Sequence, residues 1–330
     1  MNFLLLEMTF LRYFMPLILE GNKRGIKSRV FVGKNNKYNN PHSFLEFLTS
    51  LSIEAGFEMY GSEEIKKFEG PTFLIEGVGR ERLDKTKHQS YSITYMTDFS
   101  LSYKNYIDEV DRVIFPSKYI AEHYEKDNSK NLYLGSPKYD IELDGTKICS
   151  KYKIPNSNNA LVIAPKTRDL SASSLSLILQ TLQECGFNTL VKSRGKDPMP
   201  KSCRGDAYFE DFSWYPHTSM ELMKVSSLAI NFGSTSAKEL TMLGVPFINF
   251  DIKPQHRHGV DHGKHRLGFD FLYEKDHCIT LKKTSTMSDF ASSISSLAGK
   301  DWSDSFSKTR KKYLFEGNSS ERILDYLEKS

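Results

Sequence analysis

Short apolar runs alternate with amphipathic stretches along roughly the first 140 residues, and this alternation predicts a parallel sheet wrapped by helices. The chain opens with a predicted strand and a helix that ends near Gly21. Ser117 follows the last apolar run of this half and is expected to cap a helix over Lys118–Tyr124. The predicted strands are Asn2–Leu6, Arg29–Val32, Phe73–Glu76, Ser92–Met96 and Arg112–Phe115.

The same alternation restarts after a polar, turn-rich stretch that ends near Asn159. Leu175, Ile178, Leu179 and Leu182 follow the i, i+3, i+4, i+7 spacing of a helix with one buried face. A second doubly wound sheet is therefore expected. Its other predicted elements are the strands ALVIAP, NTLVK, SLAINF and PFINF and the helices Thr218–Val225 and Ser234–Leu243, with a last helix at Ser320–Leu327.

A length of 330 residues exceeds what one hydrophobic core usually supports, so two domains are expected. The first would span residues 1–145 and the second residues 159–300. The polar residues 146–158 indicate a linker between them, and residues 301–330 are predicted to form C-terminal helices.

Composition indicates a folded, soluble protein, because 39% of residues are hydrophobic and 26% are charged. Glu7 and Arg12 interrupt the apolar N-terminal stretch, so neither export nor a membrane span is expected, while peripheral membrane attachment stays open. The four cysteines form no CxxC pair, which favours reduced thiols and a cytoplasmic location. A net charge of only +4 suits a local anionic ligand better than nucleic acid.

The segment LAINFGSTSAKELTMLGVPFINFD predicts a strand, a tight turn, a helix and a second strand. A glycine and two hydroxyls before a helix make a candidate phosphate seat, here Gly233, Ser234 and Thr235. Glu239 lies one helical turn further and is a candidate to bind ribose or sugar hydroxyls. In the alternative interpretation, Ser234 only caps the helix and Glu239 is solvated.

This segment resembles the C-terminal half of the GT-B superfamily, which holds nucleotide-sugar glycosyltransferases, UDP-N-acetylglucosamine 2-epimerases and CDP-glycerol glycerophosphotransferases. VDRVIFPSKYIAEHY, NLYLGSPKYD, ALVIAPKTRD and LFEGNSSERILDYL resemble other parts of that superfamily, in the matching order. The resemblance implies two Rossmann-like domains facing a cleft, with the C-terminal helix packing back on the first domain.

The resemblance also implies that donor phosphates meet basic residues after the first two strands of the second domain. Those positions hold two pairs, each of which follows a predicted strand at its carboxyl end, where open α/β sheets bind ligands. Ordinary surface charge is the alternative for each residue. The candidates are Lys166, Arg168, Lys192 and Arg194, and the closing loop adds Asn318 and Ser319.

Histidines gather in the segment IKPQHRHGVDHGKHRLGF. Imidazole suits divalent metals, but the segment lacks a helical H-x-x-x-H pattern, and its glycines and basic residues favour a closing or anion-binding loop. No metal is therefore expected. The candidate loop residues are His256, His258 and His262.

A catalytic base would come from the first domain. Glu76 and Asp98 each end a predicted strand there, and either carboxylate could take a proton from an acceptor hydroxyl. The alternative is that both only cap the loops that follow them.

The resulting hypothesis is a transferase that moves a sugar or polyol phosphate from a nucleotide-activated donor to a glycan or lipid-linked acceptor in surface polysaccharide biosynthesis. It needs no cofactor, since helix ends, hydroxyls and basic side chains would stabilise the leaving diphosphate. Two alternatives stay open. They are a nucleotide-sugar 2-epimerase and a non-catalytic nucleotide-binding partner protein.

Overall fold

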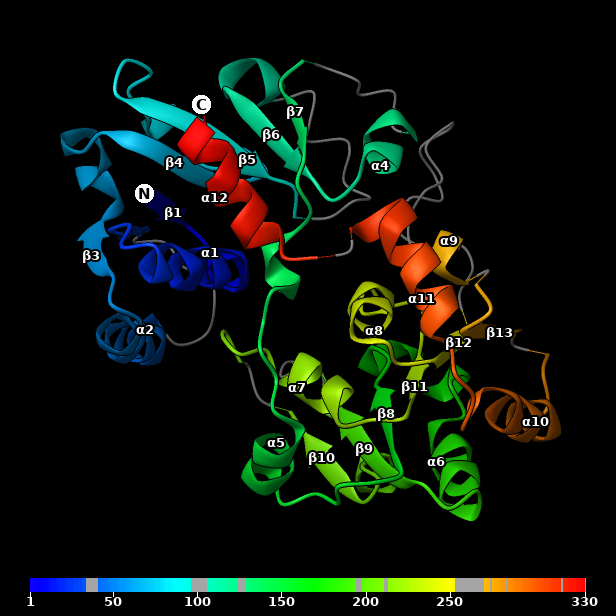
Figure 1. Cartoon of the computed structure of the whole chain (residues 1–330). Helices are drawn as coiled ribbons and strands as arrows, with labels where there is room; N and C mark the ends of the chain where they lie inside the picture. Colours follow the sequence, from blue (N-terminus) through cyan, green and yellow to red (C-terminus); the bar gives the residue numbers. More distant parts are fainter. Residues whose placement is uncertain are drawn as a thin grey trace. The chain divides into compact units, whose positions relative to one another are not determined.

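The computed structural model divides the chain into two compact units (Figure 1). Unit 1 comprises residues 1–141 and 312–330, and unit 2 comprises residues 142–311. The residues described are 1–33, 41–95, 106–123, 129–193, 198–210, 213–252, 270–273, 275–282, 284–315 and 317–329.

Unit 1 is built on a seven-stranded sheet in the order β3-β2-β1-β4-β5-β6-β7, in which every strand pair is parallel. Its central strands are short and buried, as a sheet covered on both faces requires. The strands are β1 (Asn2–Leu5), β2 (Arg29–Val32), β3 (Glu58–Gly61), β4 (Gly70–Ile75), β5 (His88–Ile93), β6 (Arg112–Phe115) and β7 (Asn131–Tyr133).

The helices of unit 1 bury the apolar positions that the sequence spaces by three and four. In α1 (Leu11–Lys23), Leu11, Phe14 and Ile18 are fully buried on one face. In α4 (Lys118–His123), the predicted cap is confirmed, because the Ser117 hydroxyl accepts a hydrogen bond from Ile120 N at 3.3 Å. The other α-helices among the described residues of unit 1 are α2 (Pro41–Ala55) and α12 (Ser319–Lys329).

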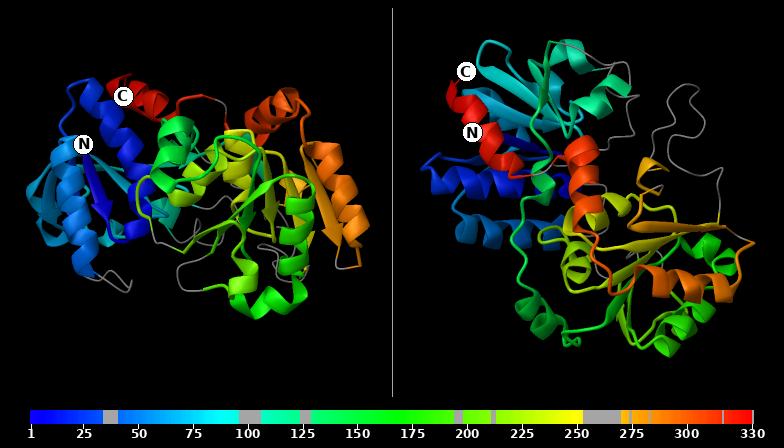
Figure 2. Two further views of the ribbon diagram at one scale, coloured as in Figure 1. Left: turned by 90° about the horizontal axis from the view of Figure 1, so that it is seen from below. Right: turned by 45° about the vertical axis from the view of Figure 1, so that its right-hand side comes forward.

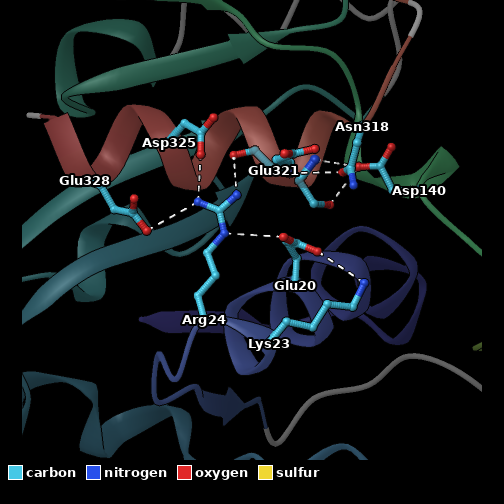
Figure 3. Close-up of polar contacts among 9 residues, drawn as sticks. Glu20, Lys23, Arg24, Asp140, Asn318, Glu321, Asp325 and Glu328 are labelled. Atoms are coloured by element: carbon cyan, nitrogen blue, oxygen red, sulfur yellow. Dashed lines mark hydrogen bonds and ion pairs between the residues drawn. The ribbon is translucent and has the colours of Figure 1, made fainter.

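The C-terminal helix α12 packs on unit 1 against α1, as expected, and Figure 2 shows the two side by side. Arg24 of α1 binds two acidic side chains of α12, with Nη1 2.7 Å from Asp325 Oδ1 and 3.3 Å from Glu328 Oε1 (Figure 3). Asp140 caps the other end of α12 by accepting hydrogen bonds from the backbone nitrogens of Ser319 and Ser320 at 3.1 and 2.5 Å.

Unit 2 is built on a six-stranded parallel sheet in the order β10-β9-β8-β11-β12-β13. Helices α6 and α10 share one hydrophobic cluster with the sheet face that carries Val162 and Ile230, and α7 packs on α8. The strands are β8 (Asn159–Ile163), β9 (Asn188–Lys192), β10 (Ala207–Phe209), β11 (Leu228–Asn231), β12 (Phe247–Asp251) and β13 (Cys278–Lys282). The helices are α5 (Gly145–Tyr152), α6 (Leu175–Glu184), α7 (Thr218–Lys224), α8 (Ala237–Leu243), α9 (Asp270–Tyr273), α10 (Met287–Leu297) and α11 (Ser303–Thr309), and a π-helical turn follows at Arg310–Leu314.

The structure corrects the expected irregular linker at 146–158, because α5 occupies its first half. The Asp144 side chain accepts hydrogen bonds from Thr146 N and Lys147 N and so starts this helix. Lys151 and Tyr152 then bind the buried carboxylate of Glu221 on α7. The segment is therefore part of unit 2 rather than a free connection, and the chain passes between the units at 141/142.

Candidate functional site

The strand order of unit 2 reverses between β8 and β11, which lie side by side. The connections after these two strands lead to helices on opposite faces of the sheet, and open α/β sheets bind ligands outside the carboxyl ends of their strands at such a point. Lys166 follows β8, and Gly233, Ser234 and Thr235 follow β11. The structure thus brings two of the predicted groups to the edge where a ligand is expected.

The turn after β11 is open to an approaching ligand at Gly233. This residue has a φ of 63°, and a β-carbon built on it would meet no described atom within 4 Å apart from those of its two neighbours in the chain. Glycine is suited to this left-handed conformation, and without a side chain it lets another group approach the backbone closely.

Two buried asparagines of β11 and β12 bind the backbone of this turn. Asn231 and Asn249 are paired across β11 and β12 and are 0% and 1% exposed. The Asn249 Oδ1 atom accepts a hydrogen bond from Gly233 N at 3.0 Å, and the Asn231 Oδ1 atom accepts one from Ser234 N at 3.3 Å. The conformation of residues 232–236 therefore depends on side chains of two strands rather than on the turn alone.

Helix α8 begins at Ala237, so the prediction that it starts at Ser234 is wrong by three residues. The reason is that Ser234 and the two residues after it form the turn, in which the Ser234 hydroxyl accepts a hydrogen bond from Ser236 N at 3.3 Å. Glu239 is only 6% exposed, so the alternative that it is solvated is also wrong. Its predicted role in binding hydroxyls stays a prediction.

Of the four predicted basic residues, the structure describes the side chains of Lys166 and Lys192, and these two differ in burial. Lys192 ends β9, pairs in register with Ile163 of β8, and is 7% exposed, with Nζ donating to Ser193 O at 2.8 Å. Lys166 is exposed just after β8. The Arg168 backbone lies in a 3-10 helix, Thr167–Ala172, and its side chain is outside the described part of the structure, as is the whole of Arg194.

Unit 1 has its own reversal of strand order, between β1 and β4, and Glu76 lies directly after β4. Its φ of 49° is unusual for a residue other than glycine and costs about 1 kcal/mol. Both carboxylate oxygens are engaged, since Oε1 accepts from Tyr95 N at 2.7 Å and Oε2 from the Tyr106 hydroxyl at 3.2 Å. The carboxylate is thus fixed at the carboxyl edge of this sheet.

The remaining predicted residues are Asp98 in the first half of the chain and Asn318 and Ser319 near its C-terminus. Asp98 lies outside the described residues. Asn318 and Ser319 begin α12 in unit 1, where Asn318 Oδ1 accepts from Glu321 N at 3.0 Å and Ser319 N donates to Asp140. Both therefore take part in starting this helix, and their predicted contact with a donor stays a prediction.

The histidine segment cannot be placed, because His256, His258 and His262 lie outside the described residues. Within the residues that the structure describes, no three His, Cys, Asp or Glu side chains are grouped in a way that could hold a metal ion. No helix in the same residues is long and apolar enough to cross a membrane.

Sequence reasoning missed Asn231 and Asn249, although a signal for both was present. The tripeptide Ile-Asn-Phe occurs at 230–232 and again at 248–250, and the structure pairs the two copies in register. The rings of Phe232 and Phe250 stack with centroids 5.5 Å apart. A polar residue repeated within two buried parallel strands indicates a side-chain contact across the sheet.

No protein-family model matches the chain, and neither does any curated protein sequence. Solved structures do match it over 99% to 100% of its length. The wall teichoic acid polymerase TagF aligns with a TM-score of 0.65, 14% identity and 88% of its own chain covered. The glycotransferase of kitacinnamycin aligns with a TM-score of 0.61 and 8% identity, with 98% of its own chain covered. The UDP-GlcNAc 2-epimerase from Neisseria meningitidis aligns with a TM-score of 0.58 and 13% identity, with 100% of its own chain covered.

The chain has the GT-B fold. Both units have the strand order 3-2-1-4-5-6 of Rossmann-like domains, and unit 1 carries one further strand. At identities of 8% to 14%, these matches establish the fold and leave the reaction to be argued from the sites.

Proposed function

We propose that the protein is a GT-B-type transferase that uses a nucleotide-activated donor to extend a surface polysaccharide. Unit 2 would bind the nucleoside diphosphate of the donor, and unit 1 would supply the residue that activates a glycan or lipid-linked acceptor. The single observation that carries the proposal is the carboxyl edge of the unit 2 sheet at β8 and β11. An open glycine turn with hydroxyl groups follows β11 there, Lys166 follows β8, and Lys192 ends the neighbouring strand β9.

The chemistry of this edge suits a diphosphate leaving group. The Thr235 hydroxyl can donate to phosphate oxygens, and the ammonium groups of Lys166 and Lys192 can offset the negative charge that grows on the diphosphate as its bond to the transferred group breaks. Ser193 O holds the Lys192 ammonium, and the two asparagines hold the backbone of the turn, so these parts need little reorganisation during the reaction. No metal is required for this step.

Glu76 is the proposed general base of unit 1. The acceptor hydroxyl oxygen would form the new bond to the transferred group, its proton would pass to the Glu76 carboxylate, and the nucleoside diphosphate or monophosphate would leave with the electron pair of the broken bond. Tyr95 N and the Tyr106 hydroxyl orient the carboxylate.

Two neighbours support the choice of donor class. TagF was solved with CDPG, and the Neisseria enzyme was solved with UDP-GlcNAc. The second neighbour also supports a nucleotide-sugar 2-epimerase as the rival function. The two activities are distinguished by incubating the protein with UDP-GlcNAc alone, because only an epimerase converts it without an acceptor.

The test of the proposal is Glu76→Gln. Glutamine keeps an oxygen for Tyr95 N and an amide group beside the Tyr106 hydroxyl, so the unit should fold as before. Turnover should fall at least about 100-fold, the contribution expected of a general base, while donor affinity stays unchanged. Tyr106→Phe is the control, since it removes one orienting bond and keeps the carboxylate. Unchanged turnover in Glu76→Gln would exclude Glu76 as the base.

A further inference from the structure

The hydrogen bonds beneath the β11 turn have a fixed direction. Backbone N–H groups can only donate, so the oxygen of Asn249 faces Gly233 N and the oxygen of Asn231 faces Ser234 N. Asn231 Nδ2 then donates to the same Asn249 oxygen at 3.2 Å. One amide oxygen, on Asn249, therefore accepts both from the turn and from the neighbouring strand.

This arrangement determines which groups of the turn can meet a ligand. The N–H groups of Gly233 and Ser234 point down to the asparagines, and Ser236 N donates to the Ser234 hydroxyl. The Ser234 hydroxyl also donates to Ser236 Oγ at 3.3 Å. The groups of the turn left for a ligand are therefore the N–H and hydroxyl of Thr235 and the hydroxyl hydrogen of Ser236. Of the predicted phosphate seat Gly233, Ser234 and Thr235, Thr235 therefore keeps the donors that can bind a phosphate.

A carboxylate at position 249 would serve the turn equally well. It would accept from Gly233 N and from Asn231 Nδ2 with the same geometry, and hydrogen bonds to a charged oxygen are roughly twice as strong as neutral ones. Structural support alone therefore gives no reason for an amide. A negative charge buried directly beneath the turn would, however, repel an anion bound above it, and burial leaves this repulsion poorly screened.

We propose that Asn249, together with Asn231, is a positioning residue. The two amides keep the buried side of the turn, where Gly233 N and Ser234 N donate, uncharged, and so let the turn accept an anionic group. This inference rests on the proposed function, because it takes the diphosphate of the donor as the anion. It adds that the selectivity of the turn for anions depends on two neutral amides that do not themselves contact the ligand.

The experiment measures the affinity for UDP and CDP by calorimetry in wild type, Asn249→Asp and Asn231→Asp, after circular dichroism has shown which variants fold. Asn249→Asp keeps both hydrogen bonds that the side-chain oxygen accepts, so it is the deciding variant. Asn231→Asp keeps the acceptor for Ser234 N but loses the Nδ2 donor to Asn249 Oδ1 and Ser234 O. At pH 8 the affinity should fall at least about tenfold relative to wild type. The ratio of the variant's affinity to that of wild type should return toward one as the pH is lowered and the new carboxyl is protonated. Loss of packing would not produce this change.

Asn159→Asp is the matched control. Asn159 is fully buried and begins β8 at the opposite, amino edge of the same sheet, where its amide donates to Pro155 O and Val225 O. This variant should lose stability and keep its affinity. Wild-type affinity in a folded Asn249→Asp or Asn231→Asp variant at pH 8 would overturn the inference alone. Failure of wild type to bind either nucleotide would overturn the proposed function together with it.

Discussion

The Asp140 carboxylate accepts two hydrogen bonds from Ser320, one from the backbone nitrogen at 2.5 Å and one from the hydroxyl at 2.7 Å. The two residues are 180 positions apart, and their contact fixes the start of α12 on unit 1. Ser320 is 1% exposed, so its backbone N–H would have no water to bind if the carboxylate were removed.

Asp140→Ala should therefore lower the free energy of unfolding by about 1–3 kcal/mol, the cost of leaving buried donors without an acceptor. Asp144→Ala is the control, because Asp144 caps α5 in the same way but its side chain is 52% exposed. Its loss should cost about 0.5–1 kcal/mol, since water can replace the cap. Urea denaturation measures both values. Equal losses in the two variants would show that burial of the Asp140 cap contributes nothing.

Asp140 should also make stability depend on pH. Burial raises the pKa of this carboxyl to about 6, from an ordinary value of 3.8. The folded state then holds the proton more tightly than the unfolded state, so this contribution is complete below pH 3.8 and is lost as the pH rises through 6. Relative to Asp140→Asn, wild type should lose on the order of 3 kcal/mol of unfolding free energy between pH 4 and 7. A difference between the two proteins that stays constant over this range would contradict the raised pKa.

Arg24→Ala should weaken the docking of α12 on α1. The guanidinium is 20% exposed and its partners Asp325 and Glu328 are about half exposed, so the expected loss is about 1 kcal/mol and should shrink in high salt. Amide hydrogen exchange in α12 measures the effect directly. Lys23→Ala is the control, because Lys23 is 66% exposed and pairs with Glu20, and exchange in α12 should stay as in wild type. Equal exchange rates in Arg24→Ala and wild type would show that the ion pairs of Arg24 do not stabilise the docking of α12.

Much of the fold follows from local sequence, and the exceptions have identifiable causes. The strand that ends at Asn231 and the strand that contains Asn249 were predicted because each is a short apolar run next to a turn. The start of α8 was wrong because side chains from two strands hold the preceding turn, which no local rule detects. Helix α5 was missed because only Ile148 and Cys149 of its eight residues are buried, too few to give a periodic pattern.

The candidate site could be predicted only in part, for the same reason. Glycine and hydroxyl residues before a helix are visible in the sequence, and so is Glu76 at a strand end. The contacts of Glu76 with Tyr95 and Tyr106 join residues 19 and 30 positions away, and their geometry depends on how the sheet is assembled. Sequence patterns therefore located the edges of the sheets, while the hydrogen bonds that orient the groups required the structure.

Gly233→Ala should lower both the stability of the protein and its affinity for a nucleotide, and a matched glycine variant separates the two effects. Both Gly233 and Gly186 have a positive φ, at 63° and 83°, and neither would place a β-carbon within 4 Å of a described atom apart from those of its two neighbours in the chain. Alanine at either position should therefore cost about 1 kcal/mol of stability from the backbone alone. Only Gly233→Ala should also weaken binding of UDP or CDP, because its methyl group stands where the ligand approaches. Equal affinities in the two variants would argue against a site at this turn.

The most direct test of the central claim, that the β8/β11 edge of unit 2 binds a nucleoside diphosphate group, is a thermal-shift screen with UDP-, CDP- and GDP-linked sugars. A ligand that binds only the folded state raises the melting temperature in proportion to the logarithm of its concentration above Kd. We predict that at least one of these donors raises the melting temperature of wild type, and that Lys192→Met reduces this rise while keeping the fold. A screen in which none of the donors changes the melting temperature would contradict the account.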